Sequence, residues 1–257
     1  MIKLLMGDCL ELMKEIPNES IDMILCDLPY GTTQNKWDSI IPFDKLWEEY
    51  ERVIKLNGAI VLTSAEPFTS ALVMSNPKLF RYDIIWEKQK GSDPLNAKRK
   101  PLRSHENILL FYKKQPTYNP QFEQGEPYTR KGDCRVKSSN FNEAKTINDK
   151  GSKDGKRYPK TVVKFSSEGM NSNNLHPTQK PQKLMEYLIK TYTNEGGLVL
   201  DNAMGSGTTM VACQNTNRSG IGMELDENYF NVAVTRVDGK KIKEKLDTQL
   251  TFFENKT

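Results

Sequence analysis

Apolar and polar residues follow two different periods along this chain. Short continuous apolar runs have the length of buried strands, and between them apolar residues recur every three or four positions, as on one face of a helix. The runs expected to form strands are residues 2–6, 21–26, 59–63, 82–86, 108–112, 198–200 and 220–224. The segments expected to form helices are residues 9–16, 43–55, 68–74, 181–193, 207–215 and a last one that begins at Asp226.

Helices and strands that alternate and are joined by short turns are typical of an open α/β sheet. A chain of 257 residues is long enough to bury a substantial core as one domain. Within it, we expect the helix at 43–55 to end at the Asn57-Gly58 pair, because glycine commonly follows the last helical turn.

The alternating pattern breaks between residues 113 and 164, a stretch rich in Lys, Asn, Gly, Ser and Pro with no sustained period of either kind. From Trp86 to Lys164 the chain carries 19 Lys and Arg against 9 Asp and Glu, while the rest carries 18 against 24. A basic segment within an acidic body is typical of a protein that binds a polyanion such as nucleic acid. The alternative is an ordinary solvated loop.

Composition narrows the class of protein further. No apolar run approaches the roughly 20 residues that a membrane-spanning helix needs. The first residues lack the pattern of a signal peptide, so we expect a cytoplasmic protein with no membrane partner. Cys9, Cys26, Cys134 and Cys213 show no Cys-x-x-Cys spacing, and His occurs only twice, so we expect no metal site.

A glycine pair follows the strand expected at 198–200 and precedes a helix. Gly205 and Gly207 can let the backbone approach a ligand closely, and about fifteen residues later Glu224 ends the next strand. A carboxylate at that place can accept hydrogen bonds from both hydroxyls of a ribose, which favours an adenosyl group. The alternative is a tight turn beside a surface acid.

Upstream, Lys180 lies in the segment 176–181, beside the start of a helix, which is a suitable place for an anion such as an amino-acid carboxylate. A proline-bounded turn is the alternative interpretation of this segment.

A second strand-end motif joins a carboxylate, a rigid turn and an aromatic ring: Asp27, Leu28, Pro29 and Tyr30. An exocyclic amine of adenine or cytosine is a poor nucleophile because its lone pair is delocalised into the ring. An acceptor on its N–H draws the nitrogen towards tetrahedral geometry, and Asp27 and the carbonyl of Leu28 can each supply one. Pro29 fixes the turn, and Tyr30 offers a face on which a flipped base can stack. A strand followed by a Pro-Tyr turn is the alternative.

Taken together, these motifs resemble those of the S-adenosylmethionine-dependent amino-methyltransferases of DNA. The closest similarity is to the permuted (beta) group, in which the catalytic motif precedes the cofactor motif. The segments that carry it are 7–10, 27–31, 103–111, 176–181 and 201–209 with Glu224. The family usually has proline where this chain has Leu28. Because that position contributes its backbone carbonyl, we expect leucine to preserve the geometry of the motif.

The resemblance implies a doubly wound, mostly parallel seven-stranded sheet of the Rossmann-like methyltransferase type, circularly permuted, with an inserted recognition segment. Residues 1–112 would form the catalytic half, 113–170 the target-recognition insert and 171–257 the cofactor half. We further expect both termini on the same side of the sheet, near the cofactor half, with residues 232–246 running back towards the first strand.

It also implies site residues. Asp27, Leu28, Pro29 and Tyr30 would be catalytic. The residues expected to bind S-adenosylmethionine are Asp8, Cys9, Asp27, Thr178, Lys180, Asp201, Ala203, Gly205, Ser206, Gly207, Thr208, Thr209, Glu224 and Leu225. The residues expected to contact nucleic acid are Arg103, His105, Arg130, Lys131, Arg135, Lys137, Arg157 and Lys160.

The expected activity is methylation of adenine N6 in double-stranded DNA, because the cytosine-N4 members of the family more often carry serine in place of Asp27. Cytosine N4, RNA or a protein glutamine are alternative acceptors. The alternative to an enzyme is an inactive homologue that binds DNA. The resemblance leaves open a homodimer and a cognate restriction endonuclease as partners.

Overall fold

The computed structural model describes residues 1–31, 38–129, 151–166 and 180–239. Its contacts divide the chain into two compact units, one formed by residues 1–119 with 161–257 and the other by residues 120–160. Among the described residues, no helix is both long and apolar enough to span a lipid bilayer.

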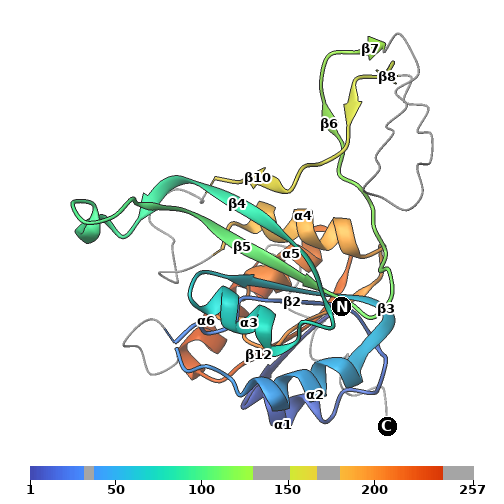
Figure 1. The fold of residues 1–257 in the computed structure, drawn as a ribbon. Helices are drawn as coiled ribbons and strands as arrows, with labels where there is room; N and C mark the ends of the chain where they lie inside the picture. Colours follow the sequence, from blue (N-terminus) through green and yellow to red (C-terminus); the bar gives the residue numbers. More distant parts are fainter. Residues whose placement is uncertain (32–37, 130–150, 167–179, 240–257) are drawn as a thin grey trace. The chain divides into compact units, whose positions relative to one another are not determined.

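The larger unit is built on a single mixed sheet (Figure 1). Only β5 runs antiparallel to its neighbours, so the prediction of a mostly parallel α/β sheet is confirmed. In spatial order the strands are β1 (Ile2–Met6), β12 (Ser219–Glu224), β11 (Leu198–Asp201), β2 (Ile21–Cys26), β3 (Ile54–Ser64), β5 (Arg103–Phe111), β4 (Phe80–Ser92) and β10 (Val162–Lys164).

Within the described part of the chain the sheet has eight strands, so the expected number of seven was wrong. The additional strand, β10, lies in the segment for which no element was predicted, because three residues are too few to show a period. It is held at the edge beside β4 by contacts that the sequence does not reveal. The backbone N–H of Ile85 donates to Thr161 O at 2.7 Å, the indole N–H of Trp86 donates to Phe165 O at 3.0 Å, and Val163 is buried.

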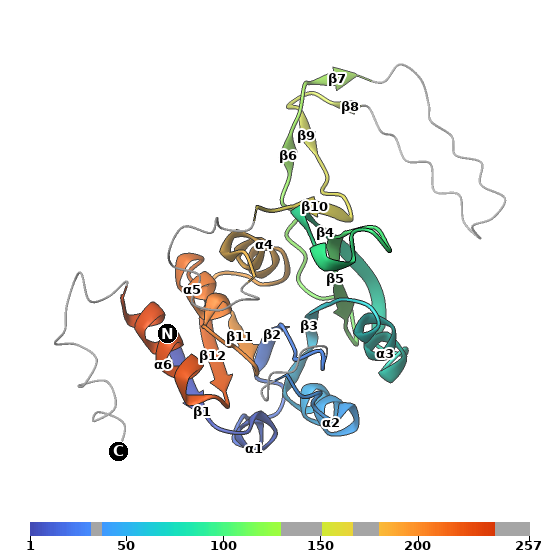
Figure 2. The ribbon, with the colours of Figure 1, turned by 90° about the vertical axis from the view of Figure 1, so that its left-hand side faces the viewer.

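Helices cover both faces of the sheet (Figure 2). One face carries α1 (Cys9–Met13), α2 (Phe43–Val53) and α3 (Phe68–Ser75), and the other carries α4 (Gln182–Tyr192), α5 (Thr208–Asn215) and α6 (Glu227–Gly239). Two separate hydrophobic clusters follow from this arrangement. Leu46, Tyr50 and Phe68 belong to the first, and Leu188 and Met210 to the second.

The boundary between α2 and β3 differs from the prediction. The helix ends at Val53, because Ile54 already has extended angles (φ −74°, ψ 135°) and begins the strand. Asn57 and Gly58 therefore lie within β3 and do not end the helix. Gly58 is needed for a different reason, since a Cβ there would stand 2.7 Å from Cδ1 of Ile54.

The start of the chain and the last described helix meet on the cofactor half of the sheet. The amino group of Met1 donates to the hydroxyl of Ser219 at 3.3 Å, and β1 pairs with β12 along its whole length. On α6, Ala233 is fully buried and Phe230 packs against the same hydrophobic cluster as Ile2 of β1. The expected course of residues 232–246 can be followed only as far as Gly239, because the rest lies outside the described residues.

The smaller unit lies within the predicted segment 113–170, and its described residues, 120–129 and 151–160, form two short antiparallel pairs of strands. β6 (Glu123–Gln124) pairs with β9 (Lys156–Arg157), and β7 (Tyr128–Thr129) pairs with β8 (Gly151–Ser152). The guanidinium of Arg157 lies 4.4 Å from the ring centroid of Tyr128, and the rings of Phe122 and Tyr158 are 4.9 Å apart. These contacts hold the described segments of this unit together. Its role in target recognition stays a prediction.

Candidate active site

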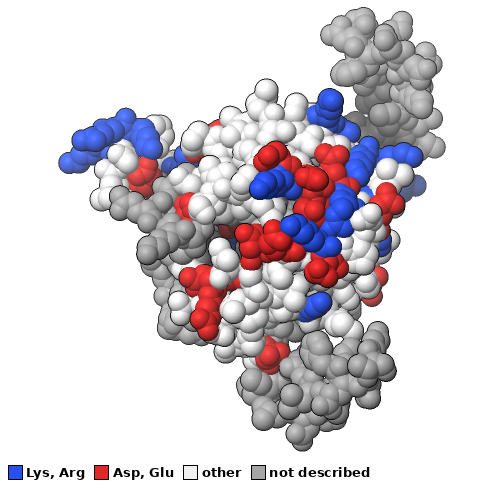
Figure 3. Space-filling model, turned by 90° about the horizontal axis from the view of Figure 1, so that it is seen from below, with Lys and Arg blue, Asp and Glu red and all other residues white. Residues whose placement is uncertain are grey.

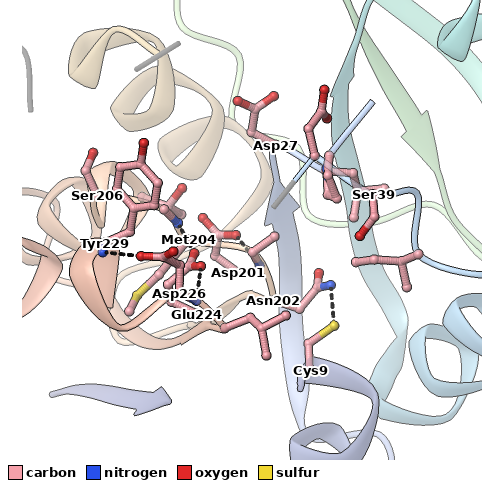
Figure 4. A pocket seen from close by; sticks show the side chains of 18 of the residues that line it. Cys9, Asp27, Ser39, Asp201, Asn202, Met204, Ser206, Glu224, Asp226 and Tyr229 are labelled. Carbon is pink, nitrogen blue, oxygen red and sulfur yellow. Dashed lines mark hydrogen bonds between the residues drawn. The ribbon is translucent and has the colours of Figure 1, made fainter. Parts of the chain in front are cut away.

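A pocket of about 510 Å³ opens where β1, β2, β11 and β12 end (Figure 4). These strands are parallel, so their carboxyl ends meet at one edge of the sheet, where open α/β folds bind their ligands. The residues that line it are Gly7, Asp8, Cys9, Leu10, Asp27, Leu28, Pro29, Tyr30, Asp38, Ser39, Ile40, Ile41, Pro42, Lys180, Met185, Asp201, Asn202, Ala203, Met204, Gly205, Ser206, Thr208, Thr209, Glu224, Leu225, Asp226 and Tyr229.

The structure brings the two predicted motifs into this one pocket. All four residues expected to be catalytic line it, and so do all those expected to bind the cofactor except Gly207 and Thr178. Thr178 lies outside the described residues. In Figure 4 Asp27 stands at the end of β2, and Asp201, Glu224 and Tyr229 lie on one side of it, while Ser39 lies on the other.

Asp27 is held by three donors. Its Oδ2 accepts a hydrogen bond from the ammonium of Lys180 at 2.7 Å, and its Oδ1 accepts one from the hydroxyl of Tyr30 at 2.8 Å and another from the hydroxyl of Thr63. An ionised carboxylate has about four acceptor positions, so this arrangement fixes the group and leaves capacity for one more donor.

Lys180 lies between two carboxylates. Its side chain is only 7% exposed, and its ammonium is 3.2 Å from Oε2 of Glu106 as well as paired with Asp27. Glu106 is itself buried and forms a second ion pair, with Lys88. Burial alone lowers the pKa of Lys180, but the carboxylates of Asp27 and Glu106 outweigh it and hold that pKa well above its usual value. The lysine predicted to face a ligand anion is thus paired with anions of the protein itself.

Tyr30 is placed by aromatic packing. Its ring stacks on Phe68 with centroids 5.0 Å apart and planes inclined by 25°, and the ammonium of Lys180 lies 5.5 Å from its centroid. Burial, and then the negative charge of Asp27, raise the pKa of the Tyr30 hydroxyl well above its usual value. The hydroxyl therefore keeps its proton and acts as a donor to Asp27.

On the opposite side of the pocket, Glu224 holds the glycine turn. Its two oxygens accept hydrogen bonds from the backbone N–H groups of Gly205 and Asp226, each at 2.9 Å. Burial raises the pKa of this carboxyl above its usual value. Each oxygen keeps a second lone pair, so the carboxylate can still accept from a diol that enters the pocket.

Gly207 shapes the turn from behind the pocket. Its φ of +78° belongs to the left-handed region, and a Cβ there would lie 2.9 Å from the Cβ of Ala233 on α6. From the same helix, Arg236 donates to the carbonyl of Ser206 at 2.7 Å and to the hydroxyl of Thr208 at 3.0 Å. The glycine lets α6 press against the turn, so it acts through packing and does not line the pocket.

Several pocket residues were missed from the sequence. Asn202 lines the pocket directly after Asp201, and its amide accepts from the hydroxyl of Tyr50 at 2.5 Å and donates to Sγ of Cys9 at 3.5 Å. Its position within the strand-end motif could have revealed it. Thr63 and Glu106 are not among the residues that line the pocket. Strand pairing brings Thr63 to Asp27, and it places Glu106, within the segment 103–111, beside Lys180.

The residues expected to contact nucleic acid are spread over both units. Arg103 and His105 are exposed on β5, and Arg103 donates to Glu66 O at 2.9 Å. Arg157 and Lys160 belong to the smaller unit, where the guanidinium of Arg157 donates to backbone carbonyls of its own hairpin. The other four, Arg130, Lys131, Arg135 and Lys137, lie outside the described residues.

Asp201 carries an energetic cost. It is 2% exposed, and burial raises its pKa from 3.8 to about 6, although hydrogen bonds from Thr209, Cys26 and the backbone of Ala203 oppose the shift. One pKa unit corresponds to about 1.4 kcal/mol, so the ionised carboxylate costs roughly 3 kcal/mol at pH 7. The folded protein binds more protons than the unfolded chain between these two pKa values. The extra protonation of Asp201 in the folded state stabilises the protein. This contribution to the free energy of unfolding is complete below pH 4 and is lost as the pH rises to about 6.

We predict that Asp201→Asn raises the free energy of unfolding of the unliganded protein at pH 7 by about 1–3 kcal/mol, because it removes the buried charge. It also flattens the fall in stability between pH 4 and pH 6. Urea unfolding at several pH values measures both effects. Glu227→Gln, which removes an exposed carboxylate of α6, is the control for the change of charge. A variant less stable than the wild type at pH 7, with the same pH dependence, would contradict the cost assigned to Asp201.

Comparison with known proteins places the fold and the site in a family. The family model described as DNA methylase matches residues 21–235, which contain both strand-end motifs. The type II methyltransferase M.HpaI of Haemophilus parainfluenzae is 28% identical over 250 residues, which cover 93% of this chain and 74% of the relative. The DNA adenine methyltransferase YhdJ of Escherichia coli (strain K12) is 28% identical over 250 residues, which cover 90% of this chain and 81% of the relative.

Solved structures are similar in fold. The crystal structure of the M1.HpyAVI–SAM complex has a TM-score of 0.64 at 24% identity and covers 93% of this chain and 100% of its own. The PvuII DNA methyltransferase, described as cytosine-N4-specific, has a TM-score of 0.68 at 18% identity. The match covers 91% of this chain and 86% of that structure. The match of the family model over most of the sheet and both motifs shows that this chain belongs to the DNA methylase family.

Proposed function

We propose that this DNA methylase transfers a methyl group from S-adenosylmethionine to N6 of an adenine flipped out of double-stranded DNA. One observation carries the proposal: the Asp27–Tyr30 motif and the turn at Gly205 line the same pocket. A methyl donor held on the turn and an amine held by Asp27 would therefore meet within one site.

The pocket fits the cofactor in size and chemistry. Its volume of about 510 Å³ lies within the usual range for small-molecule sites. Glu224 would accept from the ribose hydroxyls, the segment 7–10 with Asn202 would face the adenine, and the turn at Gly205 would approach the amino-acid end. When bound, S-adenosylmethionine supplies an electrophilic methyl group on a sulfonium.

The protein prepares the acceptor amine through Asp27. The free acceptor position of that carboxylate takes one N–H of the amine, and the carbonyl of Leu28 takes the other, which restores the nitrogen lone pair. As the N–C bond forms and the S–C bond of the donor breaks, positive charge would move onto the nitrogen, which would then lose one of its two protons. The fixed carboxylate of Asp27 would stabilise that charge. Lys180, Thr63 and the hydroxyl of Tyr30 are positioning residues, because they act on Asp27.

The choice of adenine rests on two supports. Asp27 stands where cytosine-N4 members of the family more often carry serine, and YhdJ is named a DNA adenine methyltransferase. The fold does not discriminate, since a cytosine-N4-specific enzyme shares it. Cytosine N4 is accordingly the second candidate, and an inactive DNA-binding homologue is the third.

Circular permutation and target recognition by residues 113–170 belong to the same proposal. The order β1, β2, β3 before β11 and β12 supports the permutation, because the catalytic motif then precedes the cofactor motif in the chain. The basic residues of the smaller unit, among them Lys153, Lys156 and Lys160, support its role in binding DNA. A homodimer and a cognate restriction endonuclease remain expectations from the family resemblance.

We predict that DNA incubated with the protein and S-adenosylmethionine yields N6-methyldeoxyadenosine when its nucleosides are separated by mass spectrometry. Asp27→Ala should reduce the rate by about 10³-fold, because it removes the group that stabilises charge in the transition state. Its affinity for S-adenosylmethionine by calorimetry should change little. N4-methyldeoxycytidine as the product would contradict the adenine assignment, and full activity of Asp27→Ala would contradict the role of Asp27.

We predict that Lys180→Met lowers kcat by about tenfold or more, because Asp27 loses the donor that fixes its Oδ2. The Kd for S-adenosylmethionine should stay within about twofold of the wild type, and Lys180→Arg should restore part of kcat. Lys183→Met removes an exposed cation from the adjoining helix α4 and is the matched control. Equal kcat values in Lys180→Met and Lys183→Met would contradict the positioning role of Lys180.

A further inference from the structure

The β4–β5 hairpin projects from the edge of the sheet that carries the pocket (Figure 1). β5 is antiparallel to both β3 and β4, so β4 is parallel to β3 and, through it, to β2. The carboxyl end of β4 therefore points the same way as the strand ends that hold Asp27 and Asp201. The topology alone places the hairpin tip on the side where DNA must approach.

The register connects the tip to the catalytic cluster. On β5, Glu106 pairs in register with Trp86 and lies next to Lys180, which holds Asp27. From Trp86 the strand continues to Ser92, and at about 3.3 Å per residue this part of β4 is roughly 20 Å long. The tip thus stands beyond the strand ends that hold the pocket, and the base of the hairpin carries Glu106, the second carboxylate beside Lys180.

The tip is strongly basic (Figure 3). Exposed cations gather on it from both strands and the turn, namely Lys90, Lys98, Arg99, Lys100 and Arg103. Asp93 is the one acid between Lys90 and Arg103, and it pairs with Lys100 at 2.7 Å. Within the part of the chain that the structure describes, no carboxylate forms an ion pair with Lys98 or Arg99. These two charges are available for an anionic partner.

The turn has a built shape. Asp93 has a left-handed backbone (φ 70°), and its carboxylate accepts from the amide of Asn96 at 2.8 Å. The backbone N–H groups of Arg99 and Lys100 both donate to Asn96 O, at 2.8 and 3.0 Å. A turn fixed in this way loses little conformational freedom when it binds.

A large apolar side chain stands at the end of this basic turn. Leu95, within the short helix η1 (Pro94–Asn96), is 96% exposed, and Leu102 at the far end of the turn is 45% exposed. Cations around an exposed leucine match the chemistry of a DNA duplex, because phosphates take the charges and unstacked bases take the apolar group.

We propose that residues 93–103 form a second DNA-binding element, separate from the segment 113–170. In it, Lys98 and Arg99 contact phosphates beside the target base, and Leu95 inserts against the base stack that the flipped base leaves. The inference rests on DNA being the substrate. The energetic reason is that extrusion of a paired base leaves its neighbours without a stacking partner, and an apolar side chain can take that place.

The phosphate contacts are tested with the double variant Lys98→Ala/Arg99→Ala. Its control is Lys78→Ala/Lys114→Ala, which removes two exposed cations at the opposite edge, before β4 begins and after β5 ends. We expect the Kd for duplex DNA to rise by about tenfold or more in the first variant, and the slope of log K against log salt to fall by about two, one for each lost phosphate contact. Affinity for S-adenosylmethionine should stay unchanged. Equal Kd values and slopes in both variants would overturn the proposal.

Leu95 is tested with Leu95→Ser on two duplexes, one with the target adenine paired and one with it opposite an abasic site. On the paired duplex kcat/KM should fall by about tenfold, and on the other it should stay within about twofold of the wild type, because that adenine is already unpaired. The control is Leu56→Ser, which changes an exposed leucine near the amino end of β3, at the edge of the sheet opposite the hairpin tip. An unchanged rate on the paired duplex, or the same loss on both, would overturn the role of Leu95. A wild-type protein that methylates no DNA would instead overturn the proposed function.

Discussion

The buried ion pair between Asp27 and Lys180 is the constraint on which the rest of the site depends. The two residues are 153 positions apart, and their 2.7 Å contact joins the end of β2 to the residues just before α4. A buried ammonium is tolerated only with partners, and Asp27 and Glu106 supply them. Because Lys180 is so enclosed, the contact fixes the position of the Asp27 carboxylate.

A second constraint fixes the cofactor side. The turn at Gly205 is held from in front by Glu224 and from behind by α6, through Ala233 and Arg236. Asp201, beside it, is buried at a cost in stability, which is typical of a residue kept for function. The two constraints act at the ends of β2 and β11, which are adjacent parallel strands of the mixed sheet, and this adjacency turns two separate motifs into a single pocket.

Much of this could be predicted from the sequence. Strand-end motifs such as 27–30 and 201–209 are local, since the residues that carry the chemistry follow an apolar run directly, and the structure brings both to one pocket. The partners of Asp27 could not be predicted in the same way. Thr63 reaches Asp27, and Glu106 reaches its partner Lys180, only through strand pairing, and Lys180 appeared in the sequence as a cation for a ligand. The strand β10 and the early end of α2 depend on tertiary packing, which a local period does not contain.

We expect the target amine and the methyl donor to meet between Asp27 and the Gly205 turn. A crystal structure of the protein with its target duplex and a non-reactive analogue of S-adenosylmethionine would test this arrangement. It should show the amino nitrogen of a flipped adenine within about 3 Å of the Asp27 carboxylate, facing the analogue on the Gly205 turn. A base bound in a different cleft from the analogue, or an amino group that Asp27 does not contact, would contradict it.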